Sequence, residues 1–224
     1  MKTIYTFGDS HTCMFCEVYR KPGIDKPDVL PKVVFVDRSC GVPMTAYSLD
    51  QYDDQIKKVL SSINFELEDE LWFVLGEIDV RFHVFYHHQR LEITLDASIE
   101  NVVNKYITYT KTIKDLGYNI HIVSIVPPQP NPSPYFYDPS YQILNPIRGE
   151  GITVEDRVYI TRKLNELLEQ KCLKNEIGFI NVYPYLADPD TGCNIPEMTR
   201  DGMHYYYIGD MLIDKFRLGD ADGD

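Results

Sequence analysis

Short apolar runs rich in β-branched and aromatic residues alternate along this chain with longer stretches in which apolar residues recur every three or four positions. The short runs occupy residues 3–7, 32–36, 71–75, 119–125 and 178–182. The longer stretches occupy residues 45–61, 98–116, 154–174 and 206–216. The first pattern predicts strands and the second predicts amphipathic helices. Their alternation indicates an α/β domain with three layers, α/β/α, around a central parallel sheet of about five strands.

Boundary signals refine this picture. Thr153, followed by acidic residues, is a good start for the third helix, and Gly117 is a good end for the second. No segment resembles an interdomain linker, so we expect one domain over residues 1–218 and a solvated acidic tail at 219–224. Residues 126–151, crowded with Pro and Tyr, predict a long ordered loop after the fourth strand. Such a loop either shapes a substrate site or makes a surface or oligomer contact.

Composition narrows the class of protein. The hydrophobic fraction of 44% is that of a globular protein, and no apolar run is long enough to cross a bilayer. The net charge of -12 disfavours binding to nucleic acid or to an anionic membrane, because both need a basic face. The expected partner is therefore a small molecule or a carbohydrate. The opening segment has no secretory signal and the five cysteines suit reduced thiols, which together predict a cytoplasmic location. Oligomeric state is not predicted.

Three polar blocks follow predicted strands. They are FGDSHT at residues 7–12, LGEIDVR at 75–81 and RDGMHY at 200–205. In an open α/β sheet these loops share one edge, where ligands bind, so their side chains are expected to converge. A serine hydroxyl becomes a good nucleophile when a histidine takes its proton and a carboxylate orients that histidine. The ordinary alternatives are a strand-to-helix turn at FGDSHT, and a capping Asp201 beside a surface His204.

The three blocks, in this order and over nearly the whole chain, resemble the SGNH superfamily of GDSL-type hydrolases. The GDS block is matched by Gly8, Asp9 and Ser10, and the final DxxH block by Asp201 to His204. The resemblance implies a flavodoxin-like α/β/α fold, Ser10 as nucleophile, His204 as general base and Asp201 as its orienting partner. It implies no metal and no organic cofactor.

The oxyanion hole is where this chain departs from the family pattern. The resemblance assigns the donors to the Ser10 N–H, to a glycine matched by Gly41, and to an asparagine in a GxND block. Ile78 stands where that asparagine would be, and its side chain cannot donate a hydrogen bond. We expect Arg81 to replace the missing donor, since its guanidinium is always charged. The alternative role for Arg81 is a salt bridge to Glu77 or Asp79 that shapes the loop.

Further polar and aromatic residues near the blocks are predicted to contact substrate. They are His11, Glu77, Asp79, His83, Tyr135 and Tyr137. His83, His87 and His88 have spacing compatible with metal binding on a helix, but no second ligand set completes a shell, so we expect a substrate-facing aromatic and histidine loop instead. Asp9 and His11 also match the Asp-x-His that begins two-metal phosphoesterase sites, yet the remaining ligand blocks are missing. No metal site is predicted.

The sequence therefore predicts a serine esterase that removes a small acyl group, O-acetyl by preference, from a carbohydrate. One alternative is an O-acyltransferase that passes the same acyl group to a sugar. A second is a glycan-binding or structural protein that keeps the fold without catalysis; the missing asparagine favours it, and the complete Ser10, His204 and Asp201 set opposes it.

Overall fold

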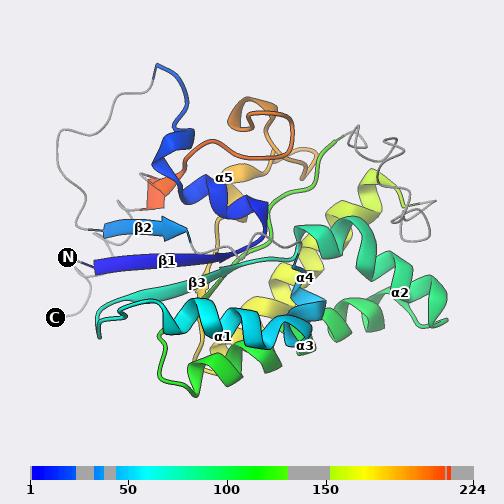
Figure 1. Ribbon diagram of the computed structural model, residues 1–224. Coiled ribbons are helices and arrows are strands. Elements are labelled where there is room, and N and C mark those ends of the chain that lie inside the picture. Colours follow the sequence, from blue (N-terminus) through cyan, green and yellow to red (C-terminus); the bar gives the residue numbers. More distant parts are fainter. Residues whose placement is uncertain (1, 24–32, 38–43, 131–151, 210, 213–224) are drawn as a thin grey trace, which may run out of the picture.

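The structure is a computed structural model that describes residues 2–23, 33–37, 44–130, 152–209 and 211–212, with only the backbone at 33–37. Within these ranges the chain forms the alternating α/β arrangement that the sequence predicts (Figure 1). Gly41, Tyr135, Tyr137 and the acidic tail lie outside the described residues, as does most of the Pro-rich loop.

A parallel sheet forms the centre of the domain. Its strands are β1 (Lys2–Gly8), β2 (Val33–Asp37), β3 (Glu70–Val74), β4 (Ile120–Val123) and β5 (Gly178–Ile180). They form a five-stranded sheet in the order β2-β1-β3-β4-β5, and each neighbouring pair is parallel. The chain leaves β1 toward β2 and later returns to the other side of β1 as β3. The loops after β1 and β3 therefore diverge at a topological switch point, where open sheets bind ligands.

Helices cover both faces of this sheet. The long helices are α1 (Asp53–Ser61), α3 (Leu95–Lys114) and α4 (Val154–Lys174), which lie on one side in Figure 1. The opposite side carries the 3-10 helix η1 (Ser10–Phe15) and the short α5 (Tyr183–Leu186). The central strand β3 shows how the two cores arise: Leu71 and Phe73 belong to one apolar cluster, whereas Trp72 and Val74 belong to the other. This alternation is the two-residue period of a strand buried on both faces. The predicted three-layer fold is confirmed.

Several predicted helix boundaries hold. The third predicted helix coincides with α4, which begins with a capping box: the Thr153 Oγ1 accepts from the Asp156 N–H, and the Asp156 carboxylate accepts from the Thr153 N–H. Gly117 follows α3 with φ +99, a backbone region that favours glycine. In the described part of the chain, no helix combines the length and apolarity needed to span a membrane.

Three predictions of secondary structure need correction. The segment treated as an aromatic and histidine loop is helical: a π-helical turn η4 (Asp79–His83) continues into α2 (Val84–Arg90). The segment contains no Gly or Pro to stop a helix, and the π-helical register obscured the period on which the prediction relied. The helix expected from 206 is also wrong at its start, since residues 206–208 are not helical; most of its remainder lies outside the described residues. The first predicted helix begins as the 3-10 helix η3 (Ala46–Tyr52) before α1.

Candidate active site

The turn after β1 places a serine at the carboxyl edge of the sheet. Gly8 is required there because a Cβ at this position would lie 1.9 Å from the Val74 carbonyl oxygen of β3. Asp9 caps η1: its Oδ1 accepts from the His11 N–H at 2.8 Å, and its own N–H donates to the Val74 carbonyl at 3.1 Å. Ser10 is the first residue of η1 and its side chain is exposed. The local sequence thus presents Ser10 outward from a turn fixed on both sides.

A second loop brings a histidine and an aspartate to this serine. The Nε2 of His204 lies 2.9 Å from Ser10 Oγ, and the Nδ1 of His204 lies 2.7 Å from Asp201 Oδ2. The other oxygen, Asp201 Oδ1, accepts from the N–H groups of Met203 and His204 at 2.9 and 2.7 Å. Gly202 permits this tight turn because it has φ +84. The three residues form a continuous relay from carboxylate to hydroxyl.

The Asp201 carboxylate is the charged end of this relay. Partial burial raises its pKa, but the hydrogen bonds from the His204 ring and from the His204 and Met203 N–H groups outweigh burial and lower the pKa to about 2. An ionised Asp201 accepts a proton-bearing Nδ1, which leaves Nε2 of His204 as an acceptor for the Ser10 hydroxyl. The geometry and charge therefore suit removal of the serine proton by His204.

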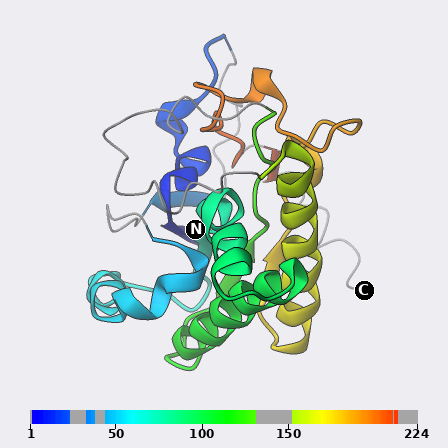
Figure 2. The ribbon, with the colours of Figure 1, turned by 90° about the vertical axis from the view of Figure 1, so that its right-hand side faces the viewer.

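The loop that carries His204 is held in place from several directions. The Asn194 Nδ2 donates to the Gly202 carbonyl at 2.9 Å, and the Arg200 N–H donates to the His204 carbonyl at 2.8 Å. The Ile208 N–H donates to the Met14 carbonyl of η1 at 2.8 Å. Because this last bond joins the histidine loop to the helix that begins with Ser10, the spacing of base and hydroxyl is set by backbone hydrogen bonds. In Figure 2 the carboxyl ends of the strands point toward the viewer.

The block after β3 packs against the same region and is largely internal. Asp79 is fully buried, and its carboxylate accepts from the Ala46 and Tyr47 N–H groups at 2.7 and 3.3 Å. It thereby caps η3 from 33 residues away in sequence. Arg81 Nε lies 2.6 Å from Glu77 Oε1, an ion pair whose angles are not those of a hydrogen bond. Of the two roles considered for Arg81, the salt bridge to Glu77 is therefore present.

The residues predicted to contact substrate differ in how far they are buried. Asp79 is fully buried and cannot touch a substrate in this conformation. His11 and Glu77 are also buried, and His11 Nδ1 lies 3.0 Å from Asp9 Oδ1. His83 is partly exposed, with Nδ1 3.4 Å from Asp79 Oδ1. Among the described residues, no group of three or more His, Cys, Asp and Glu side chains is arranged to hold a metal ion.

Two features of the site were missed by sequence reasoning. The Asp9–His11 contact could have been found, because a DxH triplet at a helix start allows an aspartate to cap and pair at once. No sequence signal marked Asn194, whose amide holds the Gly202 carbonyl of the histidine loop.

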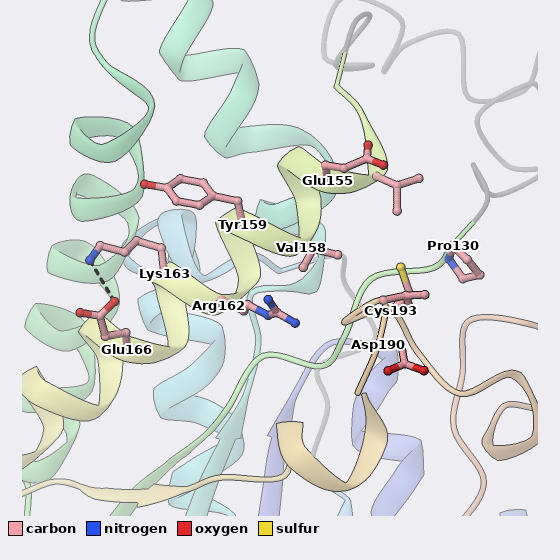
Figure 3. Close-up of a pocket in the computed structure, with 11 residues that line it drawn as sticks. Pro130, Glu155, Val158, Tyr159, Arg162, Lys163, Glu166, Asp190 and Cys193 are labelled. Atoms are coloured by element: carbon pink, nitrogen blue, oxygen red, sulfur yellow. Dashed lines mark hydrogen bonds and ion pairs between the residues drawn. The ribbon is translucent and has the colours of Figure 1, made fainter. Parts of the chain in front are cut away.

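A cavity of about 790 Å³ lies beside α4 (Figure 3). Val158 and Arg162 of α4 line one side, and Asp190 and Cys193 line the other. None of its lining residues belongs to the relay. Cys193 precedes Asn194, whose Nδ2 donates to the Gly202 carbonyl of the His204 loop.

Known proteins share this fold at low sequence identity. No family model and no curated protein match the chain. Among solved structures, a GDSL-like lipase from Bacteroides thetaiotaomicron has a TM-score of 0.56 at 15% identity, covering 97% of this chain and 86% of its own. An acetyl xylan esterase has a TM-score of 0.52 at 13% identity, covering 98% of this chain and 99% of its own. At such identity these matches show the fold alone, which is the three-layer α/β/α fold that the sequence predicts.

Proposed function

We propose that this protein is a carboxylic ester hydrolase of the SGNH type, with Ser10 as nucleophile, His204 as general base and Asp201 as the residue that orients it. The observation that carries the proposal is the unbroken relay of 2.7 and 2.9 Å contacts from Asp201 through His204 to Ser10. A structural or glycan-binding protein has no need of this arrangement. The fold shared with a lipase and an esterase supports the same chemistry by analogy.

The reaction follows from the positions of three atoms. His204 Nε2 takes the proton of Ser10 Oγ as that oxygen attacks the ester carbonyl. The protonated imidazole, held by Asp201, then gives its proton to the departing alkoxide, and an acyl group remains on Ser10. Water, deprotonated by the same Nε2, releases the acid and restores the hydroxyl. No step requires a metal or an organic cofactor.

Charge on the carbonyl oxygen needs donors in the transition state. Ser10 is the first residue of η1, where an N–H has no partner within the helix, so this N–H is one donor. Arg81 Nε pairs with Glu77 Oε1, and we propose that the terminal nitrogens of its guanidinium donate to the developing oxyanion. Gly41 stays the predicted third donor. This assignment gives Arg81 two functions at once, the ion pair and the replacement of the asparagine that Ile78 displaces.

We propose a carbohydrate bearing a small acyl group, by preference O-acetyl, as the substrate. One structural neighbour is itself an acetyl xylan esterase. Ser10 is exposed, so water has access to an acyl-enzyme, which favours hydrolysis over transfer to a sugar.

The first experiment measures p-nitrophenyl acetate hydrolysis together with the intact mass of the protein. We expect Ser10→Ala and His204→Ala to abolish turnover and the wild type to carry an acetyl adduct at Ser10. Turnover that survives Ser10→Ala would contradict the serine mechanism. Turnover on a sugar ester only when a second sugar is supplied would indicate the acyltransferase.

Arg81 is tested in the same assay with a variant that separates its two functions. Arg81→Met should lower kcat about 100-fold if it removes an oxyanion donor. The double variant Arg81→Met with Glu77→Gln removes the ion pair without leaving a buried charge. Low activity in both variants supports the donor role, whereas recovery in the double variant would reduce Arg81 to a partner of Glu77. Arg90→Met, on α2 and exposed, is the matched control.

A further inference from the structure

A second aspartate–histidine pair lies directly behind the first. His11 Nδ1 is 3.0 Å from Asp9 Oδ1, and both side chains are 3% exposed. The ring of His11 stands beside the ring of His204, with centroids 5.6 Å apart and planes inclined by 34°. Asp9 and His11 flank Ser10 in sequence, so the buried pair adjoins both the hydroxyl and its base.

The remaining ring nitrogen of His11 lies in an acidic environment. A cavity of about 10 Å³ is lined by Asp9, His11 and Glu77 together with Ser124 and four apolar residues. His11 Nε2, Asp9 Oδ2 and Glu77 Oε2 are all buried, and none has a hydrogen-bond partner among the described residues. The cavity is about the size of one water molecule, which could join these atoms. A ring nitrogen that faces carboxylate oxygens, directly or through water, is satisfied when it carries a proton.

The charged groups around His11 come from each element packed against it. Asp9 lies in its own turn, Glu77 and Arg81 follow β3, and His204 lies on the C-terminal loop. Burial alone would lower the pKa of His11, but the charge and hydrogen bond of Asp9 and the charge of Glu77 outweigh burial and the opposing Arg81, so the pKa is raised. With His11 protonated, the charges of Asp9, Glu77, His11 and Arg81 sum to zero; with His11 neutral, one negative charge is left over.

We propose that His11 is a positioning residue whose buried imidazolium keeps the adjacent His204 unprotonated and ready to accept the Ser10 proton. The inference rests on the proposed function for the role of His204, though the electrostatic coupling between the two rings does not depend on it. A positive charge beside His204 opposes the arrival of a second one, and the ring separation is short enough for a strong effect in a partly buried site. The buried pair of Asp9 and His11 thus lowers the proton affinity of His204 without touching substrate.

The test is an NMR titration of the histidine ring protons in wild type, His11→Gln and His121→Gln. His121 is the matched control, because it also pairs with a buried carboxylate, Glu70 at 3.3 Å, but lies on β4 within the sheet. Loss of the His11 charge should raise the titration midpoint of His204 by about one pH unit, a tenfold gain in proton affinity. His121→Gln should leave that midpoint unchanged. An equal midpoint in His11→Gln and wild type would overturn the proposal.

Two further readouts protect this test from a variant that folds poorly and from failure of the proposed function. In the wild type alone, the ring of His11 should titrate above the ordinary histidine value of 6.5; a midpoint at or below 6.5 would refute the inference without any substitution. In active protein, the acid limb of the kcat/KM profile should move up with the His204 midpoint in His11→Gln. If His11 had a purely structural role, His11→Gln would lower the plateau of the kcat/KM profile and leave its acid limb at the same pH. If the wild type does not hydrolyse esters but the His204 midpoint still moves in His11→Gln, the proposed esterase function is rejected and the electrostatic coupling between the two rings stands.

Discussion

The two aspartate–histidine pairs of this protein have the same chemical groups in opposite surroundings. In the pair of Asp201 and His204 the side chains are 43% and 19% exposed, whereas in the pair of Asp9 and His11 both are 3% exposed. His204 has a free ring nitrogen aimed at Ser10 Oγ, while the corresponding nitrogen of His11 is enclosed beside Glu77. Access to a hydroxyl and to water therefore suits the first pair to proton transfer. Enclosure suits the second to holding a fixed charge.

The largest expected difference between the pairs is in catalysis. Asp201→Asn should keep the loop, because an amide oxygen can still accept from the Met203 and His204 N–H groups. Its NH₂ group, however, would face Nδ1 of His204 and place the ring proton on Nε2, away from the base role. We expect kcat/KM on p-nitrophenyl acetate to fall about 10³- to 10⁴-fold with little change in unfolding free energy. A loss below tenfold would show that Asp201 does not orient the base.

The next effect separates the pairs by stability. Asp9→Asn retains an oxygen that can accept the His11 N–H, so it removes the charge and not the cap. Breaking a buried pair leaves an uncompensated charge, and we expect a loss of about 3 kcal/mol in unfolding free energy, measured by urea denaturation. Asp188→Asn is the control, since this exposed carboxylate accepts N–H bonds in a turn and should change stability by less than about 0.5 kcal/mol. Equal losses in the two variants would place Asp9 among ordinary turn residues.

The same contrast explains what the sequence could and could not predict. Ser10, Asp201 and His204 were predictable as neighbours. Ser10 follows the first strand, Asp201 and His204 come after the last strand, and the carboxyl ends of parallel strands lie at one edge of the sheet. The relay distances confirm that convergence, while their catalytic role stays a proposal. β3 was predictable because its strand is apolar on both faces, and α4 because its cap and its period agree.

Burial and long-range pairing were not predictable. Asp79 was expected at the substrate, yet its carboxylate accepts hydrogen bonds from backbone groups of η3, 33 and 32 residues distant, and no local pattern encodes those contacts. The π-helical register of η4 departs from the 3.6-residue period by which helices are predicted from sequence. For His11 the sequence gives the spacing to Asp9 but not the burial of the side chain. Burial is what separates a residue that positions the site from one that contacts a ligand.

The smallest expected effect is the pH dependence of stability. The folded-state pKa of His11 is raised above its ordinary value of 6.5, so its contribution is fully present below pH 6.5 and is lost as pH rises through the folded pKa. The stability advantage of wild type over His11→Gln should therefore shrink from pH 6 to pH 9, by about 1.4 kcal/mol for each unit between folded and unfolded pKa values. Urea denaturation at each pH gives the difference.

The exposed pair provides the internal comparison for this last prediction. The pair of Asp201 and His204 is more exposed than the pair of Asp9 and His11, so replacing His204 by Gln should change the pH dependence of stability less than His11→Gln does. If the two glutamine variants changed the profile equally, burial of His11 would have no electrostatic consequence, and the contrast between the pairs would reduce to access alone. If only His11→Gln changes it, the fold carries one aspartate–histidine pair for proton transfer and another to control the charge beside it.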